Sequence, residues 1–440
     1  MSLPRASAAH ALALAAYTLL LRLATPVWLA RLWWRGRAEP MYRHAMGERL
    51  GVYADNAAIA PGRVWIHAVS LGETRAAAAL IDALRRQRPG LRLLLTHGTA
   101  TGRAAGMPLL REGDGQVWLP IDTPGAVRRF LRRQRPAVGV PMETEIWPNL
   151  QAAARAVGVP TVLANARLSE KSRRQGERFA ALMHPAAASL SRVLAQTEDD
   201  AQRLRASGAL QVEVCGNLKY DMTPDPALLA RGQGWRCALA RPVVLAASTR
   251  EGEELPLLRA WAASLSASDA GPRPLLLLVP RHPQRFDEVA RLIDEAGLTL
   301  ARRSSWSDRP PEAAARAQVW LGDSVGEMPL YFGAADVALL GGSFAPLGGQ
   351  NLIEAATCGC PLVMGPSTYN FAEAAALSLA AGASLRVADI AEGVARALAL
   401  AQDPARPDWA ARALAFAASH RGAARRMAAA ILELLPPDLT

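Results

Sequence analysis

The stretch from Asp336 to Pro366 places a short apolar run, a glycine-rich loop and a helical pattern in direct succession. Residues 337–340 are apolar and of strand length, 351–358 carry apolar residues on one helical face, and 360–364 form a further strand pattern. The loop between them contains four glycines: Gly341, Gly342, Gly348 and Gly349. A strand that leads through such a loop into a helix is typical of α/β folds that bind phosphate, because glycines admit close approach and a helix N-terminus favours an anion.

This loop allows two interpretations. Glu354 lies one turn into the predicted helix, where its carboxylate can accept hydrogen bonds from a ribose diol. The alternative is a glycine-rich turn that only leads into a packing helix. The spacing fits neither the dinucleotide fingerprint nor a Walker A loop, and no lysine follows the glycines. Two glycine pairs followed by Asn351 and Glu354 favour a nucleotide site of another kind.

The same succession of strand, polar loop and helix recurs along the chain and predicts parallel, doubly wound sheets. The predicted strands are 64–69, 91–96, 116–119, 137–140, 161–164, 193–195 and 212–215, then 243–247, 275–279 and 319–321. The helices include 74–87 and a basic one that ends near Arg135, whose arginines we interpret as a solvated face. The pattern breaks at 221–226, so we predict one domain over 46–223 and a second over 224–440.

The chain is basic, with a formal net charge of +11 over 440 residues. Such a surface favours anionic partners: nucleic acid, an acidic membrane or a phosphorylated ligand. No nucleic-acid motif is present and aromatic residues other than tryptophan are few, which favours the last two. The four cysteines show no zinc spacing and indicate a reducing compartment, and no Asp-x-Asp pair is available to hold a divalent metal on a diphosphate.

Residues 1–45 are predicted to form a membrane anchor. The run from Ala6 to Leu21 carries no charge, and tryptophans and arginines alternate after it, which is typical of an interfacial anchor. A cleaved signal peptide is disfavoured because more arginines follow the run than precede it. A buried core helix would leave the terminal position and the tryptophans unexplained. The excess of arginine on the C-terminal side places the body of the protein in the cytosol.

Carboxylates follow two predicted strands of the first domain. Glu73 comes after 64–69, where it either performs chemistry or only compensates a helix dipole; the two interpretations are equally good. Glu143 and Glu145 follow 137–140, and alternation in extended backbone predicts that they point the same way. In the second domain, Arg281 follows a strand and is a candidate phosphate ligand, and His282 is equally well a ligand or a helix cap. Two such domains predict a ligand site in a cleft between them.

Seven segments, in order, resemble the 3-deoxy-D-manno-octulosonic acid (Kdo) transferase family of Gram-negative lipopolysaccharide synthesis. They are His67 to Glu73 (HAVSLGE), Glu143 to Asn149 (ETEIWPN), Asn165 to Ser169 (NARLS), Gly216 to Lys219 (GNLK), Pro280 to Pro283 (PRHP), Gly326-Glu327, and Gly341 to Ser343 with Asn351 and Glu354. Gln350 departs from the family, which usually has histidine there. An amide cannot carry charge, so this substitution puts a catalytic role for that side chain in doubt.

The resemblance implies the GT-B architecture, in which two Rossmann-like α/β domains face each other across a cleft. It implies CMP-Kdo as donor substrate, a lipid A precursor (lipid IVA) as acceptor, and inverting transfer at the cytoplasmic side of the inner membrane. No metal and no cofactor are expected, and nucleic acid is not an expected partner. Members that add one, two or several Kdo units share these motifs.

The resemblance also implies residue roles. Glu73 is the expected general base, and Glu143 and Lys219 are expected to stabilise the transition state. The expected donor-binding residues are Ser248, Arg281, His282, Val325, Gly326, Glu327, Gly341, Gly342, Asn351, Leu352, Ile353 and Glu354.

Two rival functions remain compatible with the residues. One is a GT-B enzyme that uses a UDP-sugar, which competition by UDP rather than CMP would reveal. The other is a membrane-tethered lipid A-binding protein with an inactive transferase fold, which the presence of Glu73, Glu143 and Lys219 disfavours.

Overall fold

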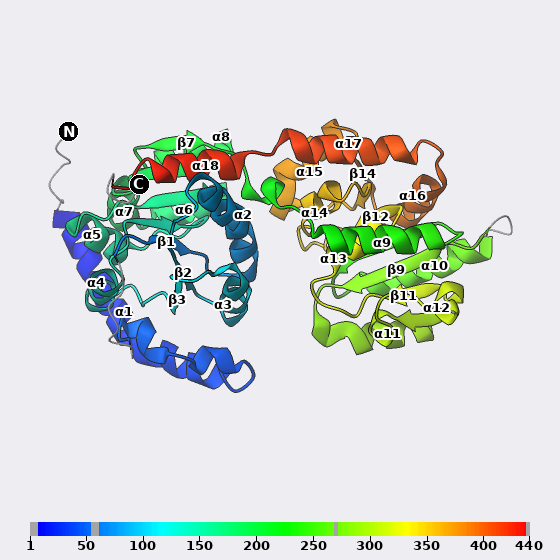
Figure 1. Cartoon of the computed structure of the whole chain (residues 1–440), viewed down its shortest axis with the longest axis horizontal. Helices are drawn as coiled ribbons and strands as arrows, with labels where there is room; N and C mark the ends of the chain where they lie inside the picture. The colour runs from blue at the N-terminus through cyan, green and yellow to red at the C-terminus, as the bar shows by residue number, and fades with distance from the viewer. Residues whose placement is uncertain (1–7, 54–60, 268–271, 437–440) are drawn as a thin grey trace. The chain divides into compact units, whose positions relative to one another are not determined.

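The computed structural model describes residues 8–53, 61–267 and 272–436, and it divides into two compact α/β units (Figure 1). Unit 1 comprises residues 1–222 with 421–440, and unit 2 comprises residues 223–420. Residues 1–7 of the predicted anchor lie outside the described residues. The predicted cleft between the domains stays a prediction.

Unit 1 contains a sheet with the strand order β3-β2-β1-β4, all parallel. These strands are β1 (Val64–His67), β2 (Leu93–His97), β3 (Gly115–Trp118) and β4 (Val138–Pro141). Two parallel bridges, Gly139 to Thr161 and Met142 to Ala164, connect it to a second parallel group, β5-β6-β7. That group comprises β5 (Val162–Ala166), β6 (Arg192–Ala195) and β7 (Val212–Val214). The predicted parallel sheet is therefore confirmed.

Helices cover both faces of this sheet because successive side chains of a strand point to opposite faces. Val64 and Ile66 pack against α2 and α18, whereas Trp65 between them packs against α4 and α5. The helices are α2 (Leu71–Gln87), α3 (Ala100–Gly106), α4 (Pro124–Gln134), α5 (Pro148–Ala156), α6 (Glu170–Glu177), α7 (Ala180–Ala188), α8 (Glu198–Ala206) and α18 (Ala423–Leu432). The structure thereby has the doubly wound arrangement that the sequence predicts.

The last helix, α18, corrects the predicted domain limits. The predicted boundary near 223 agrees with the structure, but residues 421–440 do not belong to the second domain. The apolar face of α18, including Met427 and Ile431, packs into the same core as α2 and β1. Gly422 and Ala424 also donate backbone hydrogen bonds to the Asp221 carboxylate, which ties the start of α18 to the end of unit 1. Periodicity predicts a helix here but cannot predict which sheet it covers.

Unit 2 contains seven parallel strands in the order β10-β11-β9-β8-β12-β13-β14. They are β8 (Val243–Thr249), β9 (Leu275–Pro280), β10 (Leu300–Arg302), β11 (Val319–Leu321), β12 (Val337–Leu340), β13 (Leu362–Met364) and β14 (Ser384–Arg386). Of these, β10 and β14 were not predicted: they form the two edges of the sheet, are only partly buried and each contain an arginine, so neither shows an apolar run.

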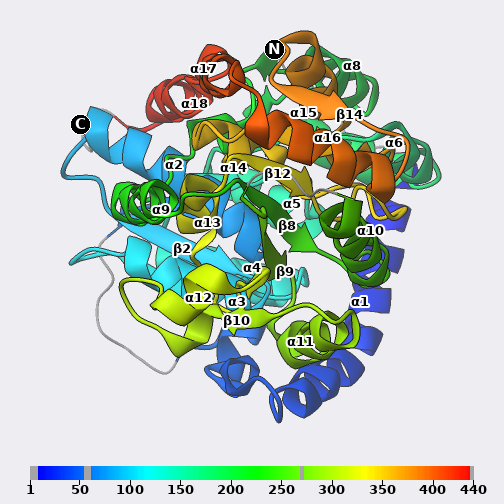
Figure 2. The same ribbon diagram turned by 90° about the vertical axis from the view of Figure 1, so that its right-hand side faces the viewer.

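The helices of unit 2 lie on both sides of its sheet. Figure 2 shows α9 (Pro226–Ala238) and α13 (Met328–Ala334) on one side of β8 and β9, and α10 (Glu254–Ala267) and α11 (Phe286–Glu295) on the other. The remaining helices are α12 (Glu312–Arg316), α14 (Leu352–Thr357), α15 (Ala372–Ala380), α16 (Ile390–Gln402) and α17 (Arg406–Ser419). The apolar faces of α10, α11 and α16 form one continuous core with the sheet.

In each sheet, the strands on either side of one position are connected in opposite directions along the sheet. This topological switch point lies between β1 and β4 in unit 1 and between β8 and β12 in unit 2. The loops that follow two such strands diverge and leave a crevice at their carboxyl ends, where α/β proteins bind ligands. Glu73 and Glu143 follow β1 and β4, Gly341 follows β12, and Ser248 is the penultimate residue of β8. The topology therefore brings the predicted residues to the ligand-binding edge of each sheet.

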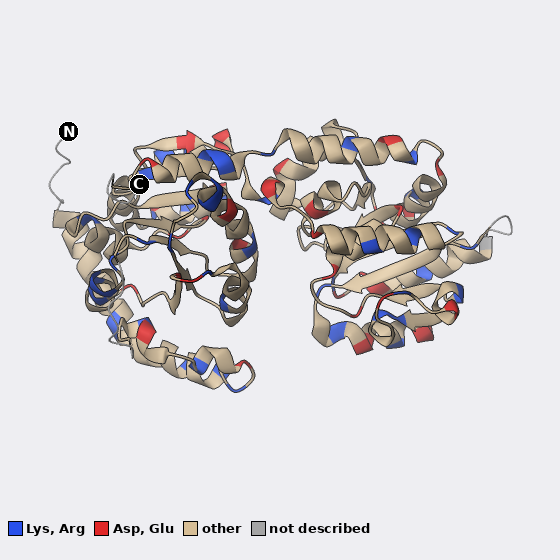
Figure 3. Cartoon of the chain, in the orientation of Figure 1, with Lys and Arg blue, Asp and Glu red and all other residues tan. Residues whose placement is uncertain are grey.

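The N-terminal helix α1 (Ala8–Arg35) lies along unit 1 beside α7 and is mostly uncharged (Figure 3). Tyr17 donates a 3.1 Å hydrogen bond to Asp122, and the ring of His10 lies 3.0 Å from the carbonyl oxygen of Ala181. A different set of side chains faces outward: Leu12, Leu19, Leu20, Leu23 and Val27 are each at least 60% exposed. Within the described residues, α1 is the helix long and apolar enough to cross a membrane.

Candidate functional site

Glu73 lies in the first turn of α2, which begins at Leu71 rather than at the predicted residue 74. Its backbone N–H bonds to the hydroxyl of Ser70, and its carboxylate accepts 2.8 and 2.9 Å hydrogen bonds from Val69 N–H and that same hydroxyl. This reciprocal arrangement is a variant of the capping box, in which the carboxylate bonds to the N–H of Val69 rather than to that of the N-cap residue Ser70. Glu73 therefore does compensate the helix dipole, and the same hydrogen bonds fix its carboxylate at the carboxyl end of β1.

Glu143 lies at the end of β4 and forms an ion pair with Arg167, with 2.7 Å between Oε2 and Nε. Its backbone has φ of +56°, and Glu145 N–H bonds back to the carbonyl of Met142. The segment is thus a turn, and the prediction that Glu143 and Glu145 point the same way in extended backbone is wrong. A left-handed residue in place of an extended one changes where the next side chains point.

Three carboxyls nevertheless gather at this edge. Burial raises the pKa of Glu73, and the negative charge of Glu143 adds to the effect. Burial and the charges of Glu73 and Glu143 raise the pKa of Glu145 to about 7. Like charges held close together disfavour simultaneous ionisation. A carboxylate with a raised pKa accepts a proton more readily near neutral pH, which is what a general base requires.

His67 at the end of β1 is buried beside Glu145. Burial, and then the nearby His97, lower the pKa of His67 to about 3, so its ring is neutral at physiological pH. Its Nδ1 contacts the carbonyl and hydroxyl of Thr96 at 3.1 and 2.9 Å, whereas its buried Nε2 has no hydrogen-bond partner. The 3.9 Å separation from Glu145 is therefore a contact between a neutral ring and a carboxyl group, not an ion pair.

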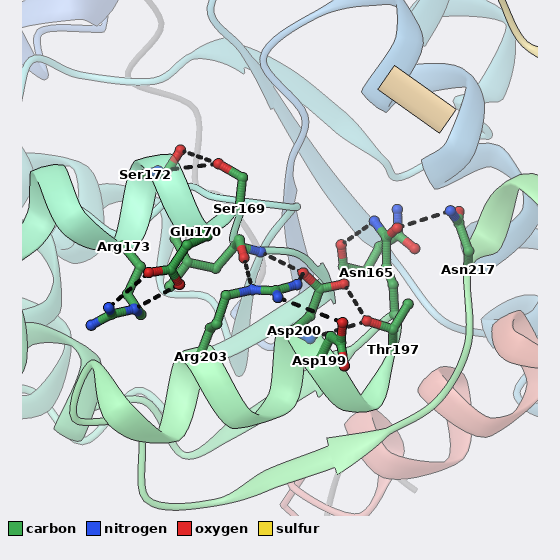
Figure 4. Close-up of polar contacts among 12 residues, drawn as sticks. Asn165, Ser169, Glu170, Ser172, Arg173, Thr197, Asp199, Asp200, Arg203 and Asn217 are labelled. Atoms are coloured by element: carbon green, nitrogen blue, oxygen red, sulfur yellow. Dashed lines mark hydrogen bonds and ion pairs between the residues drawn. The ribbon is translucent and has the colours of Figure 1, made fainter. Parts of the chain in front are cut away.

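Lys219 is placed by a chain of amide hydrogen bonds at the end of β5, and Figure 4 shows Asn165 and Asn217 of this chain. Asn165, which has φ of +53°, accepts a 3.0 Å bond from Leu218 N–H at the start of the short helix η4 (Leu218–Asp221). Asn217 bonds through Gln196 to the backbone of Asn165 and also caps Lys219 N–H. Because η4 packs against α2, this network holds Lys219 in the same part of unit 1 as Glu73.

In unit 2, the predicted donor-binding residues follow four adjacent strands. Ser248 is the penultimate residue of β8, Arg281 follows β9, Val325 follows β11 and Gly341 follows β12. All four strands are parallel, so these residues share one edge of the sheet. The side chains of Leu352 and Ile353 are buried in α14, so only their backbone is available to a ligand.

The glycine-rich loop does not present its N–H groups as the sequence suggests. The carboxylate of Glu253 accepts hydrogen bonds from the N–H groups of Gly342, Phe344 and Ala345, at 2.7, 3.0 and 3.2 Å. A phosphate therefore cannot use these donors while Glu253 occupies them. Gly342 retains its predicted place at the edge and is required for a φ of +70°, but its N–H is already bonded.

Positive charge gathers beside this loop instead. Arg281 N–H bonds to the carbonyl of Thr249, which places Arg281 next to Arg250. Burial lowers the pKa of His282, and the positive charges of Arg250, Arg281 and Arg285 lower it further. Arg285 is paired with Glu254 and Glu288, whereas no ion pair involves Arg250 or Arg281 among the residues that the structure describes. Two arginines are thus suited to an anionic ligand.

Glu327 is engaged within the fold. It accepts bonds from Arg231, Arg303 and Ser324 at 2.7, 2.9 and 2.6 Å, and these partners hold its pKa below the usual range. The adjacent Val325 is 72% exposed, and Gly326 has φ of +87°. We therefore expect any ligand contact of this segment to come from its backbone or from the exposed Val325.

Three residues of these edges were not among the predicted site residues: Arg167, Arg250 and Glu253. Arg167 and Arg250 directly follow β5 and β8, and Glu253 lies in the loop after β8. Position after a strand is a signal for all three, and Arg167 also belongs to the segment Asn165 to Ser169 that resembles the family. In the described parts of the chain, no group of three or more His, Cys, Asp or Glu side chains is arranged to hold a metal ion. The free cysteines Cys215, Cys237, Cys358 and Cys360 form no disulfide.

Residues 44–222 match the protein family described as 3-deoxy-D-manno-octulosonic-acid transferase (kdotransferase). The chain is 49% identical over 421 residues to the 3-deoxy-D-manno-octulosonic acid transferase of Bordetella pertussis, covering 93% of this chain and 96% of that protein. It is 33% identical over 386 residues to the Haemophilus influenzae protein of the same name, covering 87% and 89%.

Solved structures show the same fold at low sequence identity. The complex of Alr3699/HepE from Anabaena with UDP-glucose superposes with a TM-score of 0.56 at 16% identity, covering 85% of this chain and 100% of that chain. Together with the two parallel α/β units, this likeness confirms the predicted GT-B architecture.

Proposed function

The chain belongs to the Kdo transferase family, and we propose that it transfers Kdo from CMP-Kdo onto lipid IVA in lipopolysaccharide biosynthesis. The reaction is an inverting displacement with Glu73 as the general base. The observation that carries this proposal is the position of Glu73: a partly buried carboxyl with a raised pKa, held at the topological switch point of unit 1 beside Glu143.

The chemistry is a single displacement at the anomeric carbon of Kdo. A hydroxyl oxygen of the acceptor sugar forms the new bond to that carbon while the bond from the carbon to the phosphate oxygen of CMP breaks. The hydroxyl proton passes to Glu73, and CMP leaves with the bonding electron pair. Because attack and departure occur on opposite faces, the configuration at the anomeric carbon inverts.

Unit 1 supplies two further charged groups for this step. The positive charge of Lys219 balances the carboxylate of Kdo or the departing phosphate, and Glu143 faces the positive charge that develops on the sugar. The ion pair with Arg167 supports this role, since it holds the Glu143 carboxylate in one orientation at the edge of the sheet. Their replacement should lower kcat more than it raises KM.

Unit 2 binds the donor nucleotide at the edge that carries Arg281 and His282. The guanidinium of Arg281 can bond two oxygens of the single phosphate of CMP. We propose that Ser248, the backbone of Val325 to Glu327 and the segment Asn351 to Glu354 complete the site. A leaving group with one phosphate, neutralised by arginine, needs neither a metal ion nor a cofactor.

Helix α1 supports a location at the cytoplasmic side of the inner membrane. Its polar side chains bond to unit 1, and its exposed leucines form a face that can enter lipid. The guanidinium groups of Arg37 and Arg43 lie over the rings of Trp34 and Trp33, at 4.1 and 4.6 Å, an arrangement suited to the headgroup region. We therefore propose that α1 lies along the membrane surface.

The membrane proposal is tested with vesicles of anionic phospholipid. Replacing Leu23 with Glu should lower binding about tenfold or more, because burying one leucine is worth about 1.5–3 kcal/mol. Leu210, which is 61% exposed outside α1, provides the matched control, and Leu210→Glu should bind as the wild type does. If Leu23→Glu and Leu210→Glu bound to the vesicles equally well, the proposal that α1 contacts the membrane would be wrong.

The function itself is tested by mass spectrometry of the lipid after incubation of the protein with CMP-Kdo and lipid IVA in the presence of EDTA. A mass increase by one or more Kdo units is expected and would count the sugars added. No increase with EDTA but an increase with added magnesium would refute metal independence. No increase in either condition, with folded protein and intact acceptor, would refute the donor and acceptor assignments.

A further inference from the structure

Glu253 is a buried carboxylate, and its hydrogen-bond partners within the described residues are backbone N–H groups. The residue is 4% exposed and lies in the loop after β8, directly before α10. One oxygen accepts hydrogen bonds from Arg250 N–H at 2.9 Å and Gly342 N–H at 2.7 Å. The other accepts from Phe344 N–H at 3.0 Å and Ala345 N–H at 3.2 Å. Because four donors point at it, the group acts purely as an acceptor.

These bonds join the two loops that border the switch point of unit 2. Arg250 belongs to the loop after β8, and the other three donors belong to the loop after β12, the adjacent strand. The loops also approach closely at their bases, since a Cβ on Gly341 would lie 2.2 Å from the carbonyl oxygen of Ser248. A single side chain thus fixes the spacing of both loops where the ligand-binding crevice opens.

The rest of the glycine-rich loop is held by its own backbone. Gly349 N–H bonds to Gly342 at 2.8 Å, and Gln350 N–H bonds to Gly341 at 3.0 Å. The residues that follow, Asn351 and the start of α14, therefore take their position from a loop whose first half Glu253 holds. Loss of the carboxylate would leave three N–H groups of this loop without their partner, which is unfavourable for each group that stays buried.

A cluster of backbone N–H groups such as this one is an anion-binding arrangement. In this chain the anion is built in. We propose that Glu253 is a positioning residue of the donor site: it occupies the anion hole of the glycine-rich loop, holds that loop in its binding conformation before the ligand arrives, and leaves the donor phosphate to arginine side chains. This inference rests on the proposed function, in which the CMP moiety binds at this edge of unit 2.

The test compares two variants of buried carboxylates in the same unit. In Glu253→Gln, one oxygen remains, but the amide NH2 faces N–H donors and cannot accept from them. Asp336→Asn is the control: Asp336 is also 4% exposed and accepts from Val243 N–H at 2.8 Å, but it lies at the amino end of β12 and also pairs with Arg236 and Arg406. Both variants should lower the thermal midpoint of unfolding.

Calorimetric titration with CMP separates positioning from simple stability. Glu253→Gln should weaken CMP binding by about tenfold or more and raise the KM for CMP-Kdo to a similar degree, whereas Asp336→Asn should bind CMP as the wild type does. Equal CMP affinity of the wild type and Glu253→Gln would overturn the positioning role while leaving the proposed function intact. A wild type that does not bind CMP would overturn the donor assignment and this inference with it.

Hydrogen exchange of the wild type provides a measurement that needs no variant. Without ligand, the amides of Gly342, Phe344 and Ala345 should exchange as slowly as those of the adjacent strand β12, because each is bonded to a buried carboxylate. Rapid exchange of all three amides that slows only when CMP is added would show that the nucleotide, not Glu253, orders the loop.

Discussion

The carboxyl group of Glu145 lies 3.9 Å from Nε2 of His67, a buried ring nitrogen without a hydrogen-bond partner. Nδ1 of His67 contacts the carbonyl oxygen of Thr96, which can only accept, so the ring proton belongs on Nδ1 and Nε2 is left as an acceptor. A hydrogen bond requires a separation shorter than 3.9 Å, so Glu145 does not bond to Nε2 in this arrangement. The pKa of Glu145 is raised to about 7, and a proton on this carboxyl reduces the negative charge beside Glu73.

We predict that Glu145→Gln changes the pH dependence of stability. The pKa of Glu145 rises from 4.5 in the unfolded chain to about 7 in the fold, so the folded state binds more protons between these values. Its contribution is fully present below pH 4.5 and is lost as the pH rises through about 7. Up to about 3 kcal/mol is at stake. Urea unfolding from pH 5 to 8 should show a shallower decline for the variant.

Two other carboxyl groups with raised pKa values also contribute to the pH dependence of stability. Burial also raises the pKa of Asp122, to about 6, which adds to the decline in both proteins. Burial raises the pKa of Glu73 as well, and loss of the Glu145 charge removes the repulsion between these two carboxyls, so the predicted difference comes from Glu145 and its effect on Glu73. Parallel curves for wild type and Glu145→Gln would contradict the raised pKa.

We predict that Glu73→Gln removes catalysis but not donor binding. The amide cannot accept the hydroxyl proton, so kcat should fall by roughly 10²–10⁴, the usual contribution of general base catalysis. Its remaining oxygen can still accept the N–H bond of the capping box, which limits the loss of stability. Release of CMP in the presence of lipid IVA measures kcat, and calorimetry measures CMP affinity.

The control for this variant is Asp82→Asn, an exposed acid on the same helix. It should retain wild-type kcat. Turnover by Glu73→Gln near the wild-type rate would exclude Glu73 as the base.

We predict that Arg281→Ala weakens the donor interaction. A hydrogen bond to a charged group contributes about 1.5–3 kcal/mol, so KM for CMP-Kdo should rise roughly 10- to 100-fold, with a smaller change in kcat. Arg291→Ala, which removes an exposed arginine of α11, should leave both constants unchanged. A pure kcat effect in Arg281→Ala would instead assign Arg281 to the transition state.

We predict that Met427→Ala destabilises unit 1 although residue 427 follows unit 2 in the chain. Met427 is fully buried in the core shared by α18, α2 and β1. Truncation of a buried methionine to alanine costs about 2–5 kcal/mol. Met107→Ala, at a methionine of unit 1 that is 56% exposed, is the control and should change the unfolding free energy by less than about 0.5 kcal/mol.

Proteolysis during partial unfolding assigns the effect of Met427→Ala to a unit. Cleavage should begin within residues 61–222 in this variant. Early cleavage confined to residues 223–420 would place α18 with unit 2 and contradict the shared core.

Local sequence patterns were sufficient to predict most helices and strands and their order along the chain. Apolar runs of strand length found β1, β8, β9, β11 and β12 to within a few residues, because a strand buried on both faces must be apolar throughout. The strands β10 and β14 were not predicted because they are partly exposed edge strands that contain Arg302 and Arg386 and therefore show no apolar run. The first turn of α2 was read as a loop, although Ser70 and Glu73 have the spacing of a capping box.

The sequence by itself determined a parallel α/β chain of two units with an amphipathic N-terminus, and it placed Glu73, Glu143 and Arg281 at strand ends. Periodicity and motif order contain that information because both are local. The tertiary structure alone decided which partners these groups meet: that α18 returns to unit 1, that Glu143 turns through positive φ to pair with Arg167, and that Glu253 fills the glycine-rich loop. Each depends on residues far apart in the sequence that pack or bond only after the sheets have formed, and no local pattern specifies such contacts.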